Sequence, residues 1–235
     1  MNEQDIFQKI TDEFYWFHRH PELSYEEVET TKRLREDLAA AGIEVLDLPL
    51  KTGLVAKVGT GEAPFIALRC DIDGLPIQEE SGLAYASEHA GRMHACGHDF
   101  HISAVLGSAY LLKAKERELR GTVYLIFQPA EEAPGGARKV METGVLKDVQ
   151  AIFGLHTSPL YDVGTLGIRS GAVTASVDKF TVTFHGKGTH AAHPERGIDP
   201  IVMAASFVTA AQSIVSRNID PAHPGLVSIT HIEII

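Results

Sequence analysis

Apolar residues recur at helical spacing in the first part of the chain. Between residues 5 and 20 they are three or four positions apart, at Ile6, Ile10, Phe14 and Phe17. This period places them on one face of a helix, which Pro21 ends. A second helical pattern runs from 24 to about 41, where Gly42 is suited to end it. The sequence therefore predicts two helices before any strand.

The pattern then changes to short apolar runs between glycines and prolines, which is typical of strands. The predicted strands of this region are 45–46, 54–58, 65–70, 121–127 and 151–155. The run 121–127 is almost wholly apolar, as in a strand buried on both faces of a parallel sheet. Helical stripes at 102–112 and 137–142 lie between strands, and Asp99 is well placed to cap the first of them. Alternating strands and helices indicate an α/β fold.

A second unit begins after a break near 170–172. Apolar and polar residues then alternate over 179–185, which predicts a strand. A glycine-containing loop leads to a predicted helix at 199–216 and a predicted strand at 226–232. We place one domain at 1–175 and the start of a second, incomplete domain at 176–235.

The net charge of the chain limits the kinds of molecule that it is expected to bind. The formal net charge is −10, with 31 acidic against 21 basic residues, which argues against nucleic acid or an anionic membrane as a partner. No apolar run approaches the roughly 18 residues of a membrane span. The polar N-terminus does not resemble a signal peptide, and two cysteines form no disulfide framework, so we expect a cytoplasmic protein. A bridge between Cys70 and Cys96 remains an alternative.

A dense set of metal-ligand types lies at 93–101. It contains three histidines, one cysteine and one aspartate, namely His94, Cys96, His98, Asp99 and His101. This mixture suits a transition metal better than calcium or magnesium. Polar groups also follow three predicted strands, at Asp71 and Asp73, at Glu131 and Glu132, and at His156. Because ligand sites of open α/β sheets lie beyond the carboxyl ends of the strands, we expect these groups to converge.

Each of these residues also has a purely structural interpretation. A Glu-Glu pair is usually solvated surface, and the two aspartates fit a turn equally well. The histidines alone fit core or surface positions, but Cys96 beside them favours the metal interpretation. Cys70 fits a core residue better than a ligand. His190 and His193 fit an ordinary glycine-containing loop as well as a flexible loop that brings an imidazole to a substrate.

Five motifs occur in order along the chain. They are RCDIDGLP at 69–76, MHACGHD at 93–99, FQPAEE at 127–132, GLH at 154–156 and GTHAA at 188–192. Together they resemble the metal-dependent amidohydrolases, the peptidase family of hippurate hydrolase, N-acyl-amino-acid deacylases and auxin-conjugate hydrolases. The segment HRHPELS at 18–24 resembles the opening motif of that family. The resemblance implies a zinc-peptidase-like catalytic domain with a mixed, largely parallel sheet flanked by helices, followed by the first part of a ferredoxin-like α+β lid or dimerisation domain.

The resemblance also implies roles for single residues. The metal ligands would be Cys96, His98, Glu132 and His156, with the Cys96 thiolate between two divalent ions of manganese, zinc, cobalt or nickel. Glu131 would be the general base. His190 would reach the active site of a partner subunit and stabilise the oxyanion. Asp73 would orient a ligand histidine, and the supporting residues would also include Asp99, His94 and His101.

The implied function is hydrolysis of the amide bond of N-acyl amino acids or related small amides by a metal-activated water, as in an aminoacylase, a carboxypeptidase or hippurate hydrolase. Homodimers or higher oligomers would form through the lid domain. Family members are longer, so we expect this chain to end inside the lid and before a last ligand histidine. Two alternatives stay open: a truncated relative that binds metal and ligand without turnover, and a cysteine hydrolase with Cys96 as nucleophile.

Overall fold

The computed structural model describes residues 2–233. The chain forms two compact units that divide between Leu166 and Gly167, whereas the sequence placed the domain boundary at 175. The predicted helices and strands of the first unit are all formed, with ends shifted by a few residues. Its helices are α1 (Glu3–Arg19), α2 (Val28–Ala40), α3 (His98–Ala114), the short 3-10 helix η1 (Glu116–Glu118) and α4 (Gly136–Glu142). Its strands are β1 (Glu44–Val45), β2 (Leu54–Gly59), β3 (Phe65–Asp71), β4 (Thr122–Gln128) and β5 (Val149–Gly154).

The five strands form one mixed sheet in the order β1-β2-β4-β3-β5. Strands β4, β3 and β5 run parallel, and β2 is antiparallel to both β1 and β4. In the parallel register Cys70 lies opposite Phe127, and Arg69 lies opposite Gly154. The carboxyl ends of β3, β4 and β5 therefore meet at one edge of the sheet.

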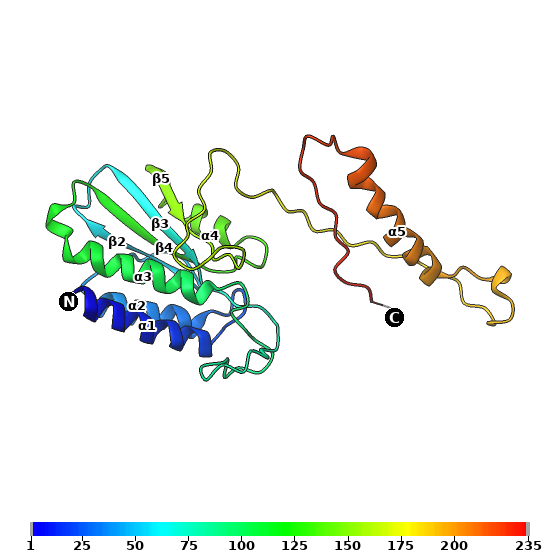
Figure 1. Ribbon diagram of the computed structural model, residues 1–235, viewed down its shortest axis with the longest axis horizontal. Helices are drawn as coiled ribbons and strands as arrows, with labels where there is room; N and C mark the ends of the chain where they lie inside the picture. The colour runs from blue at the N-terminus through cyan, green and yellow to red at the C-terminus, as the bar shows by residue number, and fades with distance from the viewer. Residues whose placement is uncertain (1, 234–235) are drawn as a thin grey trace. The chain divides into compact units, whose positions relative to one another are not determined.

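Helices cover both faces of this sheet (Figure 1). Residues Leu54, Ala56 and Val58 of β2 pack into the larger core cluster together with α1, α2 and α3. Val55 points to the opposite face, where it packs with Val140 of α4. The alternation along one strand thus supplies two separate apolar layers. This architecture confirms the predicted mixed sheet flanked by helices.

The prediction that Asp99 caps α3 is wrong. The residue before the helix is Gly97, whose φ of +79° lies in the left-handed region that glycine adopts at little cost. Asp99 lies in the first turn, where its Oδ1 accepts a hydrogen bond from the Phe100 N–H. Its Oδ2 accepts from His18 Nδ1 of α1 at 2.6 Å. The Asp99 carboxylate therefore pairs with His18, which is 81 positions away in the sequence and is not indicated by the local pattern.

The second unit contains helix α5 (Pro200–Asn218) and the 3-10 turn η2 (Pro194–Arg196). Asp199 caps α5, because its Oδ1 accepts hydrogen bonds from two backbone N–H groups of the first turn. The predicted strands at 179–185 and 226–232 are not formed in this part of the described chain, and Phe180 is 59% exposed. An alternating segment becomes a strand only when a neighbouring strand pairs with its backbone. Among residues 2–233, no helix combines the length and apolar character needed to cross a membrane.

Candidate metal centre

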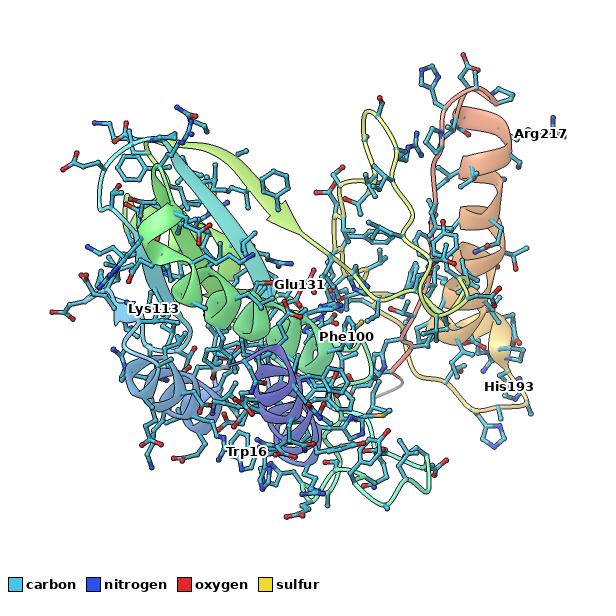
Figure 2. The ribbon with its side chains drawn as sticks, turned by 60° about the vertical axis from the view of Figure 1, so that its left-hand side comes forward. Trp16, Phe100, Lys113, Glu131, His193 and Arg217 are labelled. Atoms are coloured by element: carbon cyan, nitrogen blue, oxygen red, sulfur yellow. The ribbon has the colours of Figure 1, made fainter. Side chains whose placement is uncertain are left out.

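Side chains from four segments meet beyond the carboxyl edge of the sheet. Three groups of possible ligands have their atoms within 4.8 Å of one another, and all three contain His98. The groups are Cys96, His98 and His156; His98, Glu131 and Glu132; and Asp71, His98 and His101. Glu131, labelled in Figure 2, follows the end of β4. The structure therefore brings together the polar groups that follow separate strands in the sequence.

The turn that carries Cys96 is held against the loop that follows β5. A Cβ atom on Gly97 would lie 2.5 Å from Thr157 Oγ1, so only glycine permits this approach. The Thr157 hydroxyl donates to the Cys96 carbonyl, and the Thr157 N–H donates to His101 Nε2 at 2.9 Å. Thr157 thereby places its neighbour His156 beside Cys96. Its own role was missed from the sequence, where no signal other than adjacency to His156 marks it.

His98 presents an unpartnered nitrogen to this site. Its Nδ1–H donates to the Asp73 carbonyl at 2.8 Å, so Nε2 carries the lone pair of the neutral ring. Nε2 is buried without a hydrogen-bond partner among the described residues. It lies 3.7 Å from Asp71 Oδ2 and 3.8 Å from Glu132 Oε1. A lone pair facing two carboxylates is satisfied when a cation lies between them.

The electrostatics around His98 favour positive charge. Burial by itself lowers the pKa of His98, but the Asp73 hydrogen bond and the Asp71 and Asp73 charges outweigh burial and raise it. The pKa of Cys96 is raised to about 12, first by burial and then by the hydrogen bond and charge of Glu132. A divalent cation among these groups would compensate the carboxylates and favour the thiolate.

The two other expected ligands have suitable orientations. His156 Nδ1–H donates to the Thr157 carbonyl at 2.7 Å, which leaves Nε2 as the acceptor of the ring. Glu132 is held through its backbone, because its N–H donates to Asp73 Oδ2 at 3.0 Å. Together with Cys96 and His98 they supply one sulfur, two nitrogens and a carboxylate, a donor set that fits a transition metal.

Glu131 belongs to one of the ligand groups, and its carboxylate accepts no hydrogen bond in the described residues. Its N–H donates to Asp73 Oδ1 at 3.0 Å. Burial raises the pKa of Glu131, and the charges of Glu132 and Asp71 raise it further. A carboxylate next to a metal site is suited to accept a proton and to return it.

The third group, Asp71 with His98 and His101, is largely satisfied by protein contacts. Asp71 Oδ1 accepts from His101 Nδ1 at 2.6 Å, and Oδ2 accepts from Arg69 at 2.8 Å. These contacts and the nearby His98 charge outweigh burial and hold the pKa of Asp71 well below its usual range. His101 accepts from Thr157 with its other nitrogen. The sequence did not distinguish this pair from a turn aspartate and a further histidine.

Other residues singled out from the sequence do not belong to these three ligand groups. His190 belongs to the second unit, where its Nδ1 accepts from the Ala192 N–H at 3.1 Å. His94 is buried at 4% exposure, and neither ring nitrogen has a partner in the described chain. Cys70 is a buried core residue, and Cys70 and Cys96 are both free thiols. The alternative disulfide between them is therefore not formed.

Comparison with known proteins identifies the family of the chain. Residues 67–231 match peptidase family M20/M25/M40. N-acetylcysteine deacetylase of Bacillus subtilis (strain 168) is 52% identical over 218 residues, which is 92% of this chain and 57% of that protein. IAA-amino acid hydrolase ILR1-like 5 of Arabidopsis thaliana is 47% identical over 230 residues, 98% of this chain and 53% of the relative. The chain thus spans about half the length of these curated relatives.

A solved structure shows the same arrangement of elements. The YXEP protein of Bacillus subtilis, described as a dinuclear metal binding peptidase from the M20 family, superposes with a TM-score of 0.73 at 44% identity. The match covers 89% of this chain and 57% of the other. The family match, the sequence identity and the fold all indicate the same family. The chain belongs to peptidase family M20/M25/M40.

Proposed function

We propose that this chain carries the metal centre of a hydrolase that cleaves the amide bond of N-acyl amino acids or related small amides. The observation that carries the proposal is His98, whose buried Nε2 has no hydrogen-bond partner among the described residues and faces two carboxylates. One ligand atom of His98 also lies within 4.8 Å of ligand atoms of Cys96 and His156. Relatives named as a deacetylase of N-acetylcysteine and a hydrolase of IAA-amino acids both suggest an acyl group joined to an amino acid.

Cys96, His98, Glu132 and His156 would hold two divalent ions. The relative described as a dinuclear metal binding peptidase supports this number. Manganese, zinc, cobalt and nickel all suit the donor set. Bound ions of this kind make a water acidic and polarise an amide carbonyl.

Glu131 would act as the general base. Its carboxylate would accept a proton from the attacking water and return it to the amine nitrogen as the amide bond breaks. Burial and the charges of Glu132 and Asp71 raise the pKa of Glu131, which makes its carboxylate a stronger proton acceptor. Adjacent glutamates would thus have different tasks, one as base and one as ligand.

His190 would stabilise the negative charge that develops on the carbonyl oxygen. Because His190 Nδ1 accepts the Ala192 N–H, the neutral ring carries its proton on Nε2, which is then a donor. We place this contact in a homodimer or higher oligomer, across subunits through the second unit. We also propose a cytoplasmic location, where reducing conditions would keep the Cys96 thiol available for metal.

The test is hydrolysis of hippurate and N-acetyl amino acids before and after chelation, with manganese, zinc or cobalt restored. Loss of activity on chelation and its recovery with metal are expected. Activity that survives complete metal removal would instead support Cys96 as a nucleophile. Metal binding without hydrolysis of any substrate would support the non-catalytic alternative.

Glu131→Gln is expected to lower kcat by at least about 100-fold, because the amide cannot accept the proton. Bound metal, counted by elemental analysis, should stay at the wild-type ratio. A variant that turns over normally would remove Glu131 from the role of base.

A further inference from the structure

Two buried glutamates at the start of α2 have different partners. Glu22 caps the helix, because its carboxylate oxygens accept from the Glu29 N–H at 3.1 Å and the Thr30 N–H at 2.8 Å. Glu27 occupies the position directly before the helix, yet its side chain makes no capping hydrogen bond. The helix is thus capped by Glu22, and the Glu27 carboxylate is directed to another part of the molecule.

Glu27 reaches the segment that follows β4. Its Oε1 accepts from the Ala130 N–H at 2.7 Å, although the two residues are 103 positions apart. The residue is fully buried at 0% exposure, and Oε2 has no partner among the described residues. Burial raises the pKa of Glu27, while the hydrogen bond from the Ala130 N–H opposes that rise. Burying a carboxylate costs free energy, and helix capping does not account for this one. Carboxylates in such surroundings cluster at functional sites.

Ala130 has a backbone conformation that alanine rarely adopts. Its φ of +49° lies in the left-handed region, so the surroundings must hold it there. Three consecutive N–H groups of this segment donate to two buried carboxylates. Ala130 donates to Glu27, and Glu131 and Glu132 donate to Asp73. The direction in which both glutamate side chains leave the backbone is therefore fixed by these two acceptors.

Close packing encloses the same segment. A Cβ on Gly53 would lie 2.5 Å from Pro129 Cδ, and a Cβ on Gly136 would overlap the Pro129 and Ala130 carbonyl oxygens. The Tyr25 hydroxyl donates to the Pro134 carbonyl at 2.6 Å. The segment is thus tightly surrounded, and Glu27 supplies the acceptor for Ala130.

We propose that Glu27 is a positioning residue for the metal centre, which fixes the Ala130 peptide and thereby aims Glu131 and Glu132. The inference rests on the proposed function, since it assumes that these two glutamates serve as base and ligand. Among the described residues, the Glu27 carboxylate is hydrogen-bonded to the Ala130 N–H and to none of the proposed ligands. Its effect would pass through the backbone of 130–132.

The test compares Glu27→Ala, Glu27→Asp and Glu27→Gln with Glu22→Ala in the full chain. Cobalt affinity is measured from the visible absorption of bound Co²⁺, and hydrogen exchange is followed in the peptide that contains 129–132. Glu27→Ala and the shorter Glu27→Asp are expected to weaken cobalt binding about 10-fold or more and to speed exchange there. Glu27→Gln, which keeps an acceptor for the Ala130 N–H, should recover most of the affinity.

Glu22→Ala is the matched control, because it removes a second buried carboxylate, whose hydrogen bonds go to the first turn of α2. It should lower the urea midpoint without changing cobalt affinity or exchange at 129–132. The proposal is overturned if the Glu27 variants also lose only stability. Should Glu27→Ala fail to fold, Glu27→Asp and Glu27→Gln decide the question by the same two measurements.

Failure of the proposed function would look different. If Glu132→Ala binds cobalt as tightly as the wild type, Glu132 is not a ligand and the metal assignment is wrong. Hydrogen exchange of 129–132 in the Glu27 variants would still show whether Glu27 holds this segment.

Discussion

Among single residues, His98 shows how one hydrogen bond prepares a ligand. The Asp73 carbonyl can only accept, so it selects the tautomer with the proton on Nδ1 and the lone pair on Nε2. At 1% exposure the ring has little freedom to turn. A ligand held in this way loses little conformational entropy when it binds metal.

His98→Ala is therefore expected to weaken cobalt binding by more than about 10-fold. Loss of a residue that only orients a ligand has an effect of this size, and loss of the ligand itself should weaken binding at least as much. Cobalt titration followed by visible absorption measures the change. His223→Ala is the control, since that imidazole is 75% exposed and belongs to the second unit. Equal affinities of the two variants would exclude His98 as a ligand.

His18 is a second buried histidine, and its surroundings favour the protonated ring. Its Nδ1 and Nε2 face Asp99 at 2.6 Å and Glu79 at 3.2 Å. The Asp99 hydrogen bond, helped by Glu79, outweighs burial and raises the pKa of His18 above 6.5. The folded state binds the proton more tightly than the unfolded state, so this stabilisation is complete below about pH 6.5 and is lost as pH rises through the folded pKa.

His18→Gln should accordingly be less stable than the wild type by about 1–3 kcal/mol at pH 5.5, where both ring nitrogens of His18 donate to carboxylates. The difference should shrink as the pH is raised. Urea unfolding at a series of pH values measures it. Parallel stability curves for the two proteins from pH 5 to 9 would contradict the assignment.

At the level of elements, the start of α3 joins the sheet edge to the β5 loop. The Gly97 turn brings Cys96 to the ligand set and begins the helix that carries His98 and His101. Thr157 contacts both sides of this junction. The position of the metal centre therefore depends on how closely one turn approaches one loop.

Gly97→Ala tests this junction against Gly91→Ala. Both glycines have positive φ, +79° and +73°, but a Cβ on Gly97 would meet Thr157, while a Cβ on Gly91 would meet nothing within 4 Å. Each substitution should cost about 1–2 kcal/mol of unfolding free energy for the backbone conformation. Only Gly97→Ala is expected to weaken cobalt binding as well. If both variants bind cobalt normally, close approach at Gly97 does not shape the site.

For the molecule as a whole, the proposed ligands tie together distant parts of the first unit. Cys96 comes from the turn before α3, His98 from the first turn of α3, and Glu132 and His156 from the loops after β4 and β5. Unfolding of this unit would separate them, so metal should bind the folded state in preference to the unfolded one.

Metal is therefore expected to raise the midpoint of thermal unfolding. At a free concentration 100 times Kd the stabilisation should be about 2.7 kcal/mol, and a chelator should reverse it. Calorimetry with and without Co²⁺ measures the shift, with Cys96→Ser as the control. An equal shift in Cys96→Ser would show that the metal stabilises the chain at some other place.

The sequence by itself determined the local elements of the first unit. Periodicity of apolar residues predicted α1 and α3, and apolar runs predicted β3, β4 and β5, because burial requires these patterns wherever the partners lie. The motifs at 93–99 and 127–132 also identified the residue types of a metal site. The roles of Glu131 and His190 stay predictions.

Only the tertiary structure decided which polar groups pair. Asp99 contacts His18 instead of capping a helix, Asp71 contacts His101, and Glu27 contacts Ala130. These hydrogen bonds join residues 30 to 103 positions apart, and no periodic pattern records the partner of a single carboxylate. The strands predicted at 179–185 and 226–232 failed for the same physical reason. A strand is defined by the neighbour that pairs with it, and alternation along one segment does not supply that neighbour.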